Sequence, residues 1–304
     1  MLSGSVSPDG TRLAYVAGEY SWDVLEVSLA DRTTRALVAG GGIAVWPDWA
    51  PSGTHFLFNS TWSIVDQSAK DGFTRQLIQA GSEYDVGSAQ WASDGLRFSF
   101  FGPEEKLVLS NASGGRTAVL DSGVRFGLAG WSPDGQWIAY ARRSGGEDQL
   151  AKMRPGSGEA SLILTHGPTH THAIDRYPRL QWSPSGEWIL YPNFGENGLS
   201  LISPDGSMGR KLTSREFSTY GFSKDGRQVL GIYWNPNPAG TEWQMYAVDV
   251  KSGAEKLLGG IDLPPATEAM AGFSMHPDGK SFLTSIAKWP FDIWMMEGFD
   301  QHKG

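Results

Sequence analysis

The sequence contains 304 residues, of which 40% are hydrophobic and 19% are charged, a composition typical of a folded protein rather than a disordered one. Its 25 Lys and Arg residues are outnumbered by 33 Asp and Glu residues, and the net charge of −8 argues against general binding to nucleic acid or to an anionic membrane. The chain has no cysteine, so it offers no disulfide bond, thiolate zinc site or cysteine nucleophile.

A short cassette recurs along the whole chain. It reads WSPDGQWIAY from Trp131 and WSPSGEWILY from Trp182: an aromatic residue, a small polar residue, Pro, Asp or Ser, Gly, and then alternating apolar residues. Seven copies occur, and their glycines are Gly10, Gly53, Gly95, Gly135, Gly186, Gly226 and Gly279. Most of these glycines are about 40 residues apart, and such a period indicates a repeat architecture.

Each cassette predicts a β-hairpin. Proline, aspartate and glycine together favour a tight turn, and the apolar alternation on either side is typical of strands. A third strand and a fourth strand follow most cassettes, as in SIVDQS from Ser63 and TRQLI from Thr74. Four antiparallel strands in about 40 residues correspond to one blade of a β-propeller. The sequence therefore predicts an all-β, seven-bladed propeller, with a six-bladed ring as the alternative.

The two ends of the chain complicate this prediction. The last unit stops after its third strand, near Phe299, and only residues 1–4 precede the first cassette. Either the last blade is incomplete, or residues 1–304 form one propeller domain of a longer protein whose upstream residues supply a closing strand. We favour the second interpretation, because an unpaired edge strand promotes association.

Length variation is concentrated in one kind of connection. The cassette turns are short and alike, whereas the second-to-third strand loops and the connections between blades vary. In a propeller these variable connections share one face of the disc, and variable loops on a rigid scaffold often carry function. The longest are 165–178, 233–242 and 259–271, with 18–22 and 286–291 on the same face.

A histidine cluster occupies the longest of these loops. His166, His170 and His172 form an H-x3-H-x-H pattern, and Asp175 follows closely. Imidazole and carboxylate groups bind divalent metals, so one metal ion is a possible cofactor. The spacing fixes no geometry within a loop, and we favour solvated histidines and no cofactor.

The residues after this cluster lead into the first strand of the fifth unit. Asp175, Arg176, Tyr177 and Arg179 are placed to line the mouth of the central channel and hold a carboxylate or phosphate group. An ion pair between blades, with Tyr177 packed beneath it, explains the same residues equally well.

Four tryptophans, Trp22, Trp62, Trp234 and Trp289, lie in or beside the variable connections. Exposed aromatic rings there are candidates to bind a peptide or sugar, although each ring also suits the covering of a blade edge. The cassette tryptophans are instead predicted to pack between blades, and the cassette aspartates are predicted to form turns rather than to catalyse.

The cassettes and the R-x-L strands that follow them resemble the Pro-Asp-Gly repeats of TolB-type propellers. The C-terminal segment, from EWQMYAVDV through SMHPDGKSFLT to IWMMEGF, resembles the propeller of acidobacterial-type membrane-anchored serine/threonine protein kinases. The resemblance implies a bacterial, periplasmic or otherwise extracytoplasmic sensor module. No kinase motif occurs in the chain, and TolB itself has six blades.

No catalytic signature of a hydrolase, phosphate-loop enzyme or metalloprotease is present. We therefore predict a non-catalytic module that binds a protein, peptide or carbohydrate on the long-loop face, without binding nucleic acid or inserting into a membrane. The alternative is a metal-dependent lyase or hydrolase that uses the histidine cluster. A purely structural platform is a third interpretation.

Overall fold

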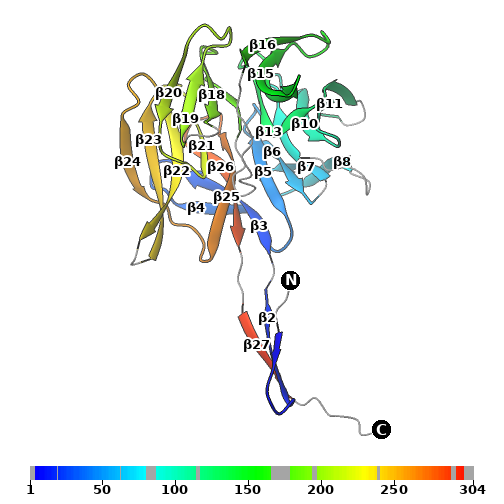
Figure 1. The fold of residues 1–304 in the computed structure, drawn as a ribbon, viewed down its shortest axis with the longest axis vertical. Helices are drawn as coiled ribbons and strands as arrows, with labels where there is room; N and C mark the ends of the chain where they lie inside the picture. Colours follow the sequence, from blue (N-terminus) through cyan, green and yellow to red (C-terminus); the bar gives the residue numbers. More distant parts are fainter. Residues whose placement is uncertain are drawn as a thin grey trace.

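The computed structural model describes residues 4–18, 20–61, 63–79, 87–113, 117–165, 179–193, 197–237, 240–288 and 292–297. In these ranges the chain forms β-strands and no helix. The described residues therefore contain no helical segment that could cross a membrane. The strands lie in six four-stranded sheets and one three-stranded sheet (Figure 1).

Five of the four-stranded sheets are each built from four consecutive antiparallel strands. Their strands are β5 (Ala44–Trp49), β6 (His55–Ser60), β7 (Ser63–Ser68) and β8 (Thr74–Gln79); β9 (Gly87–Trp91), β10 (Arg97–Gly102), β11 (Lys106–Asn111) and β12 (Thr117–Asp121); β13 (Val124–Trp131), β14 (Ile138–Ser144), β15 (Glu147–Met153) and β16 (Ala160–Thr165); β17 (Gln181–Trp182), β18 (Ile189–Pro192), β19 (Leu199–Ile202) and β20 (Gly209–Thr213); β21 (Thr219–Phe222), β22 (Gln228–Asn237), β23 (Gly240–Asp249) and β24 (Glu255–Gly260). The first strand of each sheet is innermost, which is the architecture of a propeller blade.

The sixth blade joins the two ends of the chain. Its inner strands are β25 (Thr267–Met275) and β26 (Ser281–Lys288), and its outer strands are β3 (Ser21–Ser28) and β4 (Thr34–Val38). This pairing closes the ring with backbone hydrogen bonds between β26 and β3, and no upstream strand is needed for closure.

The three-stranded sheet projects from the ring (Figure 1). It contains β1 (Gly4–Val6), β2 (Arg12–Ala17) and β27 (Asp292–Glu297), in the order β1-β2-β27. The register of β2 with β27 continues that of β3 with β26, since Ala17 pairs with Asp292 and Ser21 pairs with Lys288. We call this three-stranded sheet the arm.

The prediction of an all-β propeller is confirmed, and the ring has six blades, the alternative that the sequence left open. The leading count of seven is wrong because strands from the first unit and from the last unit together form a single blade. The third and fourth strands of the first unit complete the blade that the last cassette begins, and the remaining three strands form the arm. The predicted incomplete last blade is thereby completed by strands from the N-terminal part of the chain.

The cassette turns have the predicted structure. In one of them the Asp134 carboxylate accepts hydrogen bonds from the Ser132 hydroxyl at 2.5 Å and from the Gln136 amide at 3.0 Å, while Gly135 adopts a positive φ of 67°. These hydrogen bonds lower the pKa of Asp134. Cassette aspartates therefore hold the turn, as the sequence indicates.

Apolar side chains fill the space between neighbouring blades. Trp49 and Trp91 are 5% exposed, and Trp131 donates a hydrogen bond of 2.9 Å to Ser99 in the preceding blade. Trp182 likewise donates to the carbonyl of Gly130 at 3.0 Å. The prediction that the cassette tryptophans pack between blades is confirmed.

Candidate functional site

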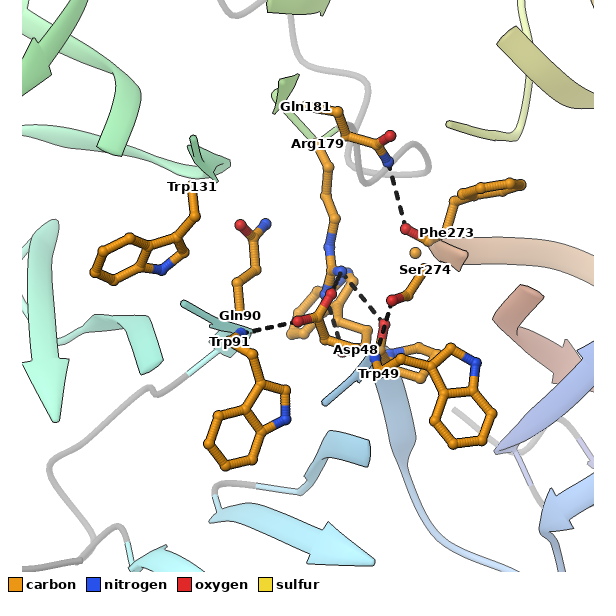
Figure 2. Close-up of polar contacts among 12 residues, drawn as sticks. Asp48, Trp49, Gln90, Trp91, Trp131, Arg179, Gln181, Phe273 and Ser274 are labelled. Carbon is orange, nitrogen blue, oxygen red and sulfur yellow. Dashed lines mark hydrogen bonds and ion pairs between the residues drawn. The ribbon is translucent and has the colours of Figure 1, made fainter. Parts of the chain in front are cut away.

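The innermost strands surround a cavity of about 190 Å³ at the centre of the ring. Five blades line it, and the residues drawn in Figure 2 approach it from β5, β9, β13, β17 and β25. Most of the polar groups lie just before the first residue of a cassette, which is Trp49, Trp91, Trp182 or Met275: Asp48, Gln90, Gln181 and Ser274.

A buried ion pair crosses this channel. Arg179, which precedes the short strand β17, directs its guanidinium toward Asp48 on β5, with 3.4 Å between Nη1 and Oδ1 (Figure 2). The same guanidinium donates to the carbonyl of Trp46 at 2.9 Å and to that of Pro47 at 3.3 Å. The Arg179 side chain is only 4% exposed, and its Nε atom is buried without a hydrogen-bond partner.

Local backbone geometry presents these carbonyls to the arginine. Trp46 has a positive φ of 53°, and the pairing of β5 with β6 shifts register between Val45 and Asp48. Gly272 on the adjacent strand β25 also has a positive φ, of 78°, and a Cβ atom there would lie 3.1 Å from the Cα of Trp46. A β-bulge in close contact with a glycine therefore turns the Trp46 and Pro47 carbonyls toward Arg179.

Burial dominates the electrostatics of the pair. It raises the pKa of Asp48 to about 6, although the positive charge of Arg179 and a 2.8 Å hydrogen bond from the Trp91 amide both favour the carboxylate. Burial also lowers the pKa of Arg179, while Asp48 opposes that change. The Asp48 side chain keeps 17% of its surface exposed, and desolvation in this channel still outweighs the attraction between the two charges.

The glutamines of the channel connect neighbouring blades. The Gln181 amide donates to the carbonyls of Tyr220 and Phe273, at 3.0 and 3.3 Å, and its oxygen accepts from the Phe222 amide at 3.2 Å. Gln90 donates to the carbonyl of Ala129 at 3.0 Å. These contacts, together with the ion pair, connect the blades around the channel.

Arg179 lies at the channel, as its position before the first strand of the fifth unit predicts, whereas Asp48 was not predicted there. The structure supports the ion pair between blades that was one of two interpretations of Arg179. A signal for Asp48 was present, because the residue just before the first cassette residue lines the channel in five blades. His166, His170, His172, Asp175, Arg176 and Tyr177 lie outside the described residues. Within the described ranges, no three His, Asp or Glu side chains form a group suited to a metal ion.

The loop tryptophans differ in their environments. Trp22 is 5% exposed, packs with Val45 and Ala287, and donates its indole N–H to the hydroxyl of Tyr20, so its ring belongs to the core rather than to a surface. Trp234 is 45% exposed on β22, opposite Trp243 of β23. Trp62 and Trp289 lie outside the described residues.

The described long connections lie at one end of the blades. The end of β26, the start of β3 and the start of β25 meet there, through the pairs Lys288–Ser21 and Thr267–Lys288. The tip of the long β22–β23 hairpin occupies the corresponding position in its blade, and the arm leaves the ring at this end (Figure 1). We call this end the long-connection face.

Comparisons with known proteins identify the fold. No family model matches the chain. An uncharacterized protein from Agrobacterium fabrum is 23% identical over 256 residues, which cover 78% of this chain and 82% of that protein. The structure of a TolB candidate from Agrobacterium tumefaciens superposes with a TM-score of 0.67 at 18% identity, and the match covers 90% of this chain and 99% of that one. The fold is a TolB-type β-propeller.

The solved structures that match this chain also include a second TolB and an enzyme. TolB from Acinetobacter baumannii matches with a TM-score of 0.51 at 12% identity, over 96% of this chain and 80% of that one. An oligogalacturonate lyase in complex with manganese matches with a TM-score of 0.56, also at 12% identity, over 95% and 96% of the two chains. At these identities the likeness establishes the fold and leaves the activity to the site itself.

Proposed function

We propose that this TolB-like propeller is a non-catalytic module that binds a protein or peptide through its long-connection face. The observation that carries the proposal is that large apolar side chains are exposed both at that end of the ring and on the arm that leaves it. Trp234 is 45% exposed on the β22–β23 hairpin, and the arm that leaves the same face exposes Trp294 and Met295 by 55% and 61%. Large exposed apolar groups of this kind are typical of binding surfaces.

The chemistry of the channel supports a binding role over a catalytic one. Arg179 and Asp48 are engaged with each other and with the backbone of β5, and the two glutamines hold the carbonyls of neighbouring blades. A catalytic group needs a position from which it reaches a substrate, whereas these groups hold the ring together. The TolB-like fold also supports our proposal that the module acts as an extracytoplasmic sensor.

The test compares two exposed aromatic residues at opposite ends of the blades. Trp234 lies on the long-connection face, and Phe73, which is 72% exposed in the β7–β8 turn, lies on the cassette-turn face. Partners are captured by crosslinking from an envelope extract with the wild-type chain, Trp234→Ala and Phe73→Ala, and are quantified by mass spectrometry. We expect a partner that Phe73→Ala retains and Trp234→Ala loses at least about tenfold. Equal retention by both variants would refute the face assignment.

The metal-dependent lyase or hydrolase predicted as the alternative gives a different result. Protein purified without a histidine tag would then contain about one divalent metal ion per chain, bound by His166, His170 and His172. Elemental analysis of the wild-type chain and of a variant with these three histidines replaced by alanine measures this content directly. A metal content near one that the triple variant loses would favour the enzyme over the binding module.

A further inference from the structure

The arm has the organisation of an incomplete blade. Strands β1 and β2 carry the first cassette, and β27 is the third strand of the last unit, paired with β2 as β3 is paired with β26. In every blade of the ring a fourth strand covers the outer edge of the third one. Among the described residues, no strand covers the outer edge of β27.

The side chains of β27 are more exposed than those at equivalent positions of the third strands in the ring. Counted from the cassette glycine, Ile293 occupies the position that in the six blades is held by Val24, Ile64, Leu107, Leu150, Leu199 and Met245. All six of these side chains are at most 2% exposed, whereas Ile293 is 80% exposed. The arm therefore presents core-type residues on a free edge strand.

The fourth strands of the ring show which sequence fits such an edge. At the register of Met295, four of the six blades place a basic residue of the fourth strand opposite the third strand: Arg35, Arg75, Arg210 and Lys256. At the register of Ile293, three blades place an aliphatic residue there: Val38, Ile78 and Leu164. Two of the six blades combine both features, with a basic residue followed three positions later by an aliphatic one, in RALV and RQLI.

We propose that the outer edge of β27 binds an extended strand of a partner protein, antiparallel to β27, with a basic residue opposite Met295 and an aliphatic residue opposite Ile293. Backbone hydrogen bonds along the edge provide affinity, and the alternating side chains provide specificity. This proposal rests on the proposed function, for which it supplies the chemistry of the partner.

The charge of the chain favours the same partner. The net charge of the chain is −8, which favours association with a basic strand. Glu297 at the end of β27 is 62% exposed and is already paired with Arg12 at 3.0 Å, so the attraction comes from the charge of the whole chain. Successive residues of a strand point to opposite faces, so Ile293 and Met295 lie on one face of the arm and Trp294 and Met296 on the other. Both faces are apolar and exposed, and a strand with apolar residues on both of its faces fits them.

The probe is a fluorescein-labelled peptide with the sequence of residues 31–40, DRTTRALVAG, which contains the fourth strand β4. A control peptide carries proline in place of Ala36 and Val38, which removes two backbone donors and keeps both arginines. Binding to the full chain is measured by fluorescence anisotropy. We expect saturable binding of the first peptide and none of the second at protein concentrations up to about 1 mM.

Two matched variants locate the binding edge. Ile293→Lys alters the free edge of β27, and Val6→Lys alters the opposite edge of the arm, where Val6 is 61% exposed. Both substitutions add the same charge to an exposed position, and circular dichroism verifies the fold of each. We expect Ile293→Lys to weaken peptide binding at least about tenfold and Val6→Lys to change it less than about twofold.

Each outcome decides the proposal. It is overturned if the wild-type chain does not bind the peptide, if both variants bind equally well, or if sedimentation shows a dimer of the chain that Ile293→Lys dissociates, since the edge would then bind a second copy. A failure here combined with Trp234-dependent capture of a partner would refute the strand proposal and leave the proposed function intact. Peptide binding without Trp234-dependent capture of a partner would support the strand proposal and refute the role of the Trp234 surface in the proposed function.

Discussion

The ring and the arm are built from the same repeat and differ in their surroundings. In the ring, the second strand of a cassette buries Ile138, Ala139 and Tyr140 completely. In the arm, the corresponding residues Leu13, Ala14 and Tyr15 are partly exposed. The cassette therefore specifies a hairpin by its local turn chemistry, while burial depends on a neighbouring blade on each face.

The first prediction compares one residue type at equivalent positions of the two regions. Ile64 on β7 is fully buried, whereas Ile293 on β27 is 80% exposed. Ile64→Ala removes packed methyl groups and leaves a cavity, so we expect it to lower the free energy of unfolding by about 3 kcal/mol. Ile293→Ala removes little buried surface and should change it by less than about 0.5 kcal/mol.

Urea unfolding monitored by circular dichroism measures both values. Equal losses for the two variants would show that the arm packs against another part of the protein in solution. In that case the free edge of β27 would not exist, and the strand-binding proposal would fall with it.

The second prediction compares two ion pairs that involve arginine. Arg179 is 4% exposed and paired with Asp48 inside the ring, whereas Arg12 of the arm is 59% exposed and lies 3.0 Å from Glu297. Arg179→Met leaves Asp48 and two backbone carbonyls buried without their donor, and we expect a loss of about 3 kcal/mol in stability. Arg12→Met should cost less than about 1 kcal/mol, because an exposed pair is screened by water.

A second substitution sharpens this result. Adding Asp48→Asn to Arg179→Met removes the unpaired carboxylate, so the double variant should be more stable than Arg179→Met alone in urea unfolding at pH 7. If the double variant loses further stability instead, the carboxylate contributes through its hydrogen bond from the Trp91 amide rather than through its charge.

These comparisons also explain which features could be predicted from the sequence. The hairpins were predictable because each turn is held by residues within five positions of one another, such as Ser132, Asp134 and Trp137. The blade count could not be predicted in the same way. It depends on strand pairs between opposite ends of the chain, such as Arg12–Glu297 and Ser28–Ser281, and no local sequence pattern marks strands that pair at such a distance. The partner of Arg179 was missed for the same reason, since Asp48 lies on a blade across the channel.

The last prediction concerns the dependence of ring stability on pH. Burial raises the pKa of Asp48 from an ordinary value of 3.8 to about 6 in the folded chain, so the folded state holds a proton that the unfolded state releases earlier. This contribution to stability is complete below about pH 4 and is lost as the pH rises through about 6. The free energy of unfolding of the wild type should therefore fall by about 2 kcal/mol relative to that of Asp48→Asn between pH 4 and pH 7.

Urea unfolding of the two chains at matched pH values measures this difference. The channel groups that face Asp48 are Arg179 from the segment before β17, the Trp91 amide from β9 and Ser274 from β25, and of these only Arg179 carries a charge. Removing that charge with Arg179→Met should move the loss of stability to higher pH, because the positive charge no longer favours the carboxylate. A pH dependence that is identical in the wild type and in Asp48→Asn would mean that Asp48 is hydrated in the folded ring. The ion pair would then resemble the exposed Arg12–Glu297 pair of the arm in its energetics, despite its central position.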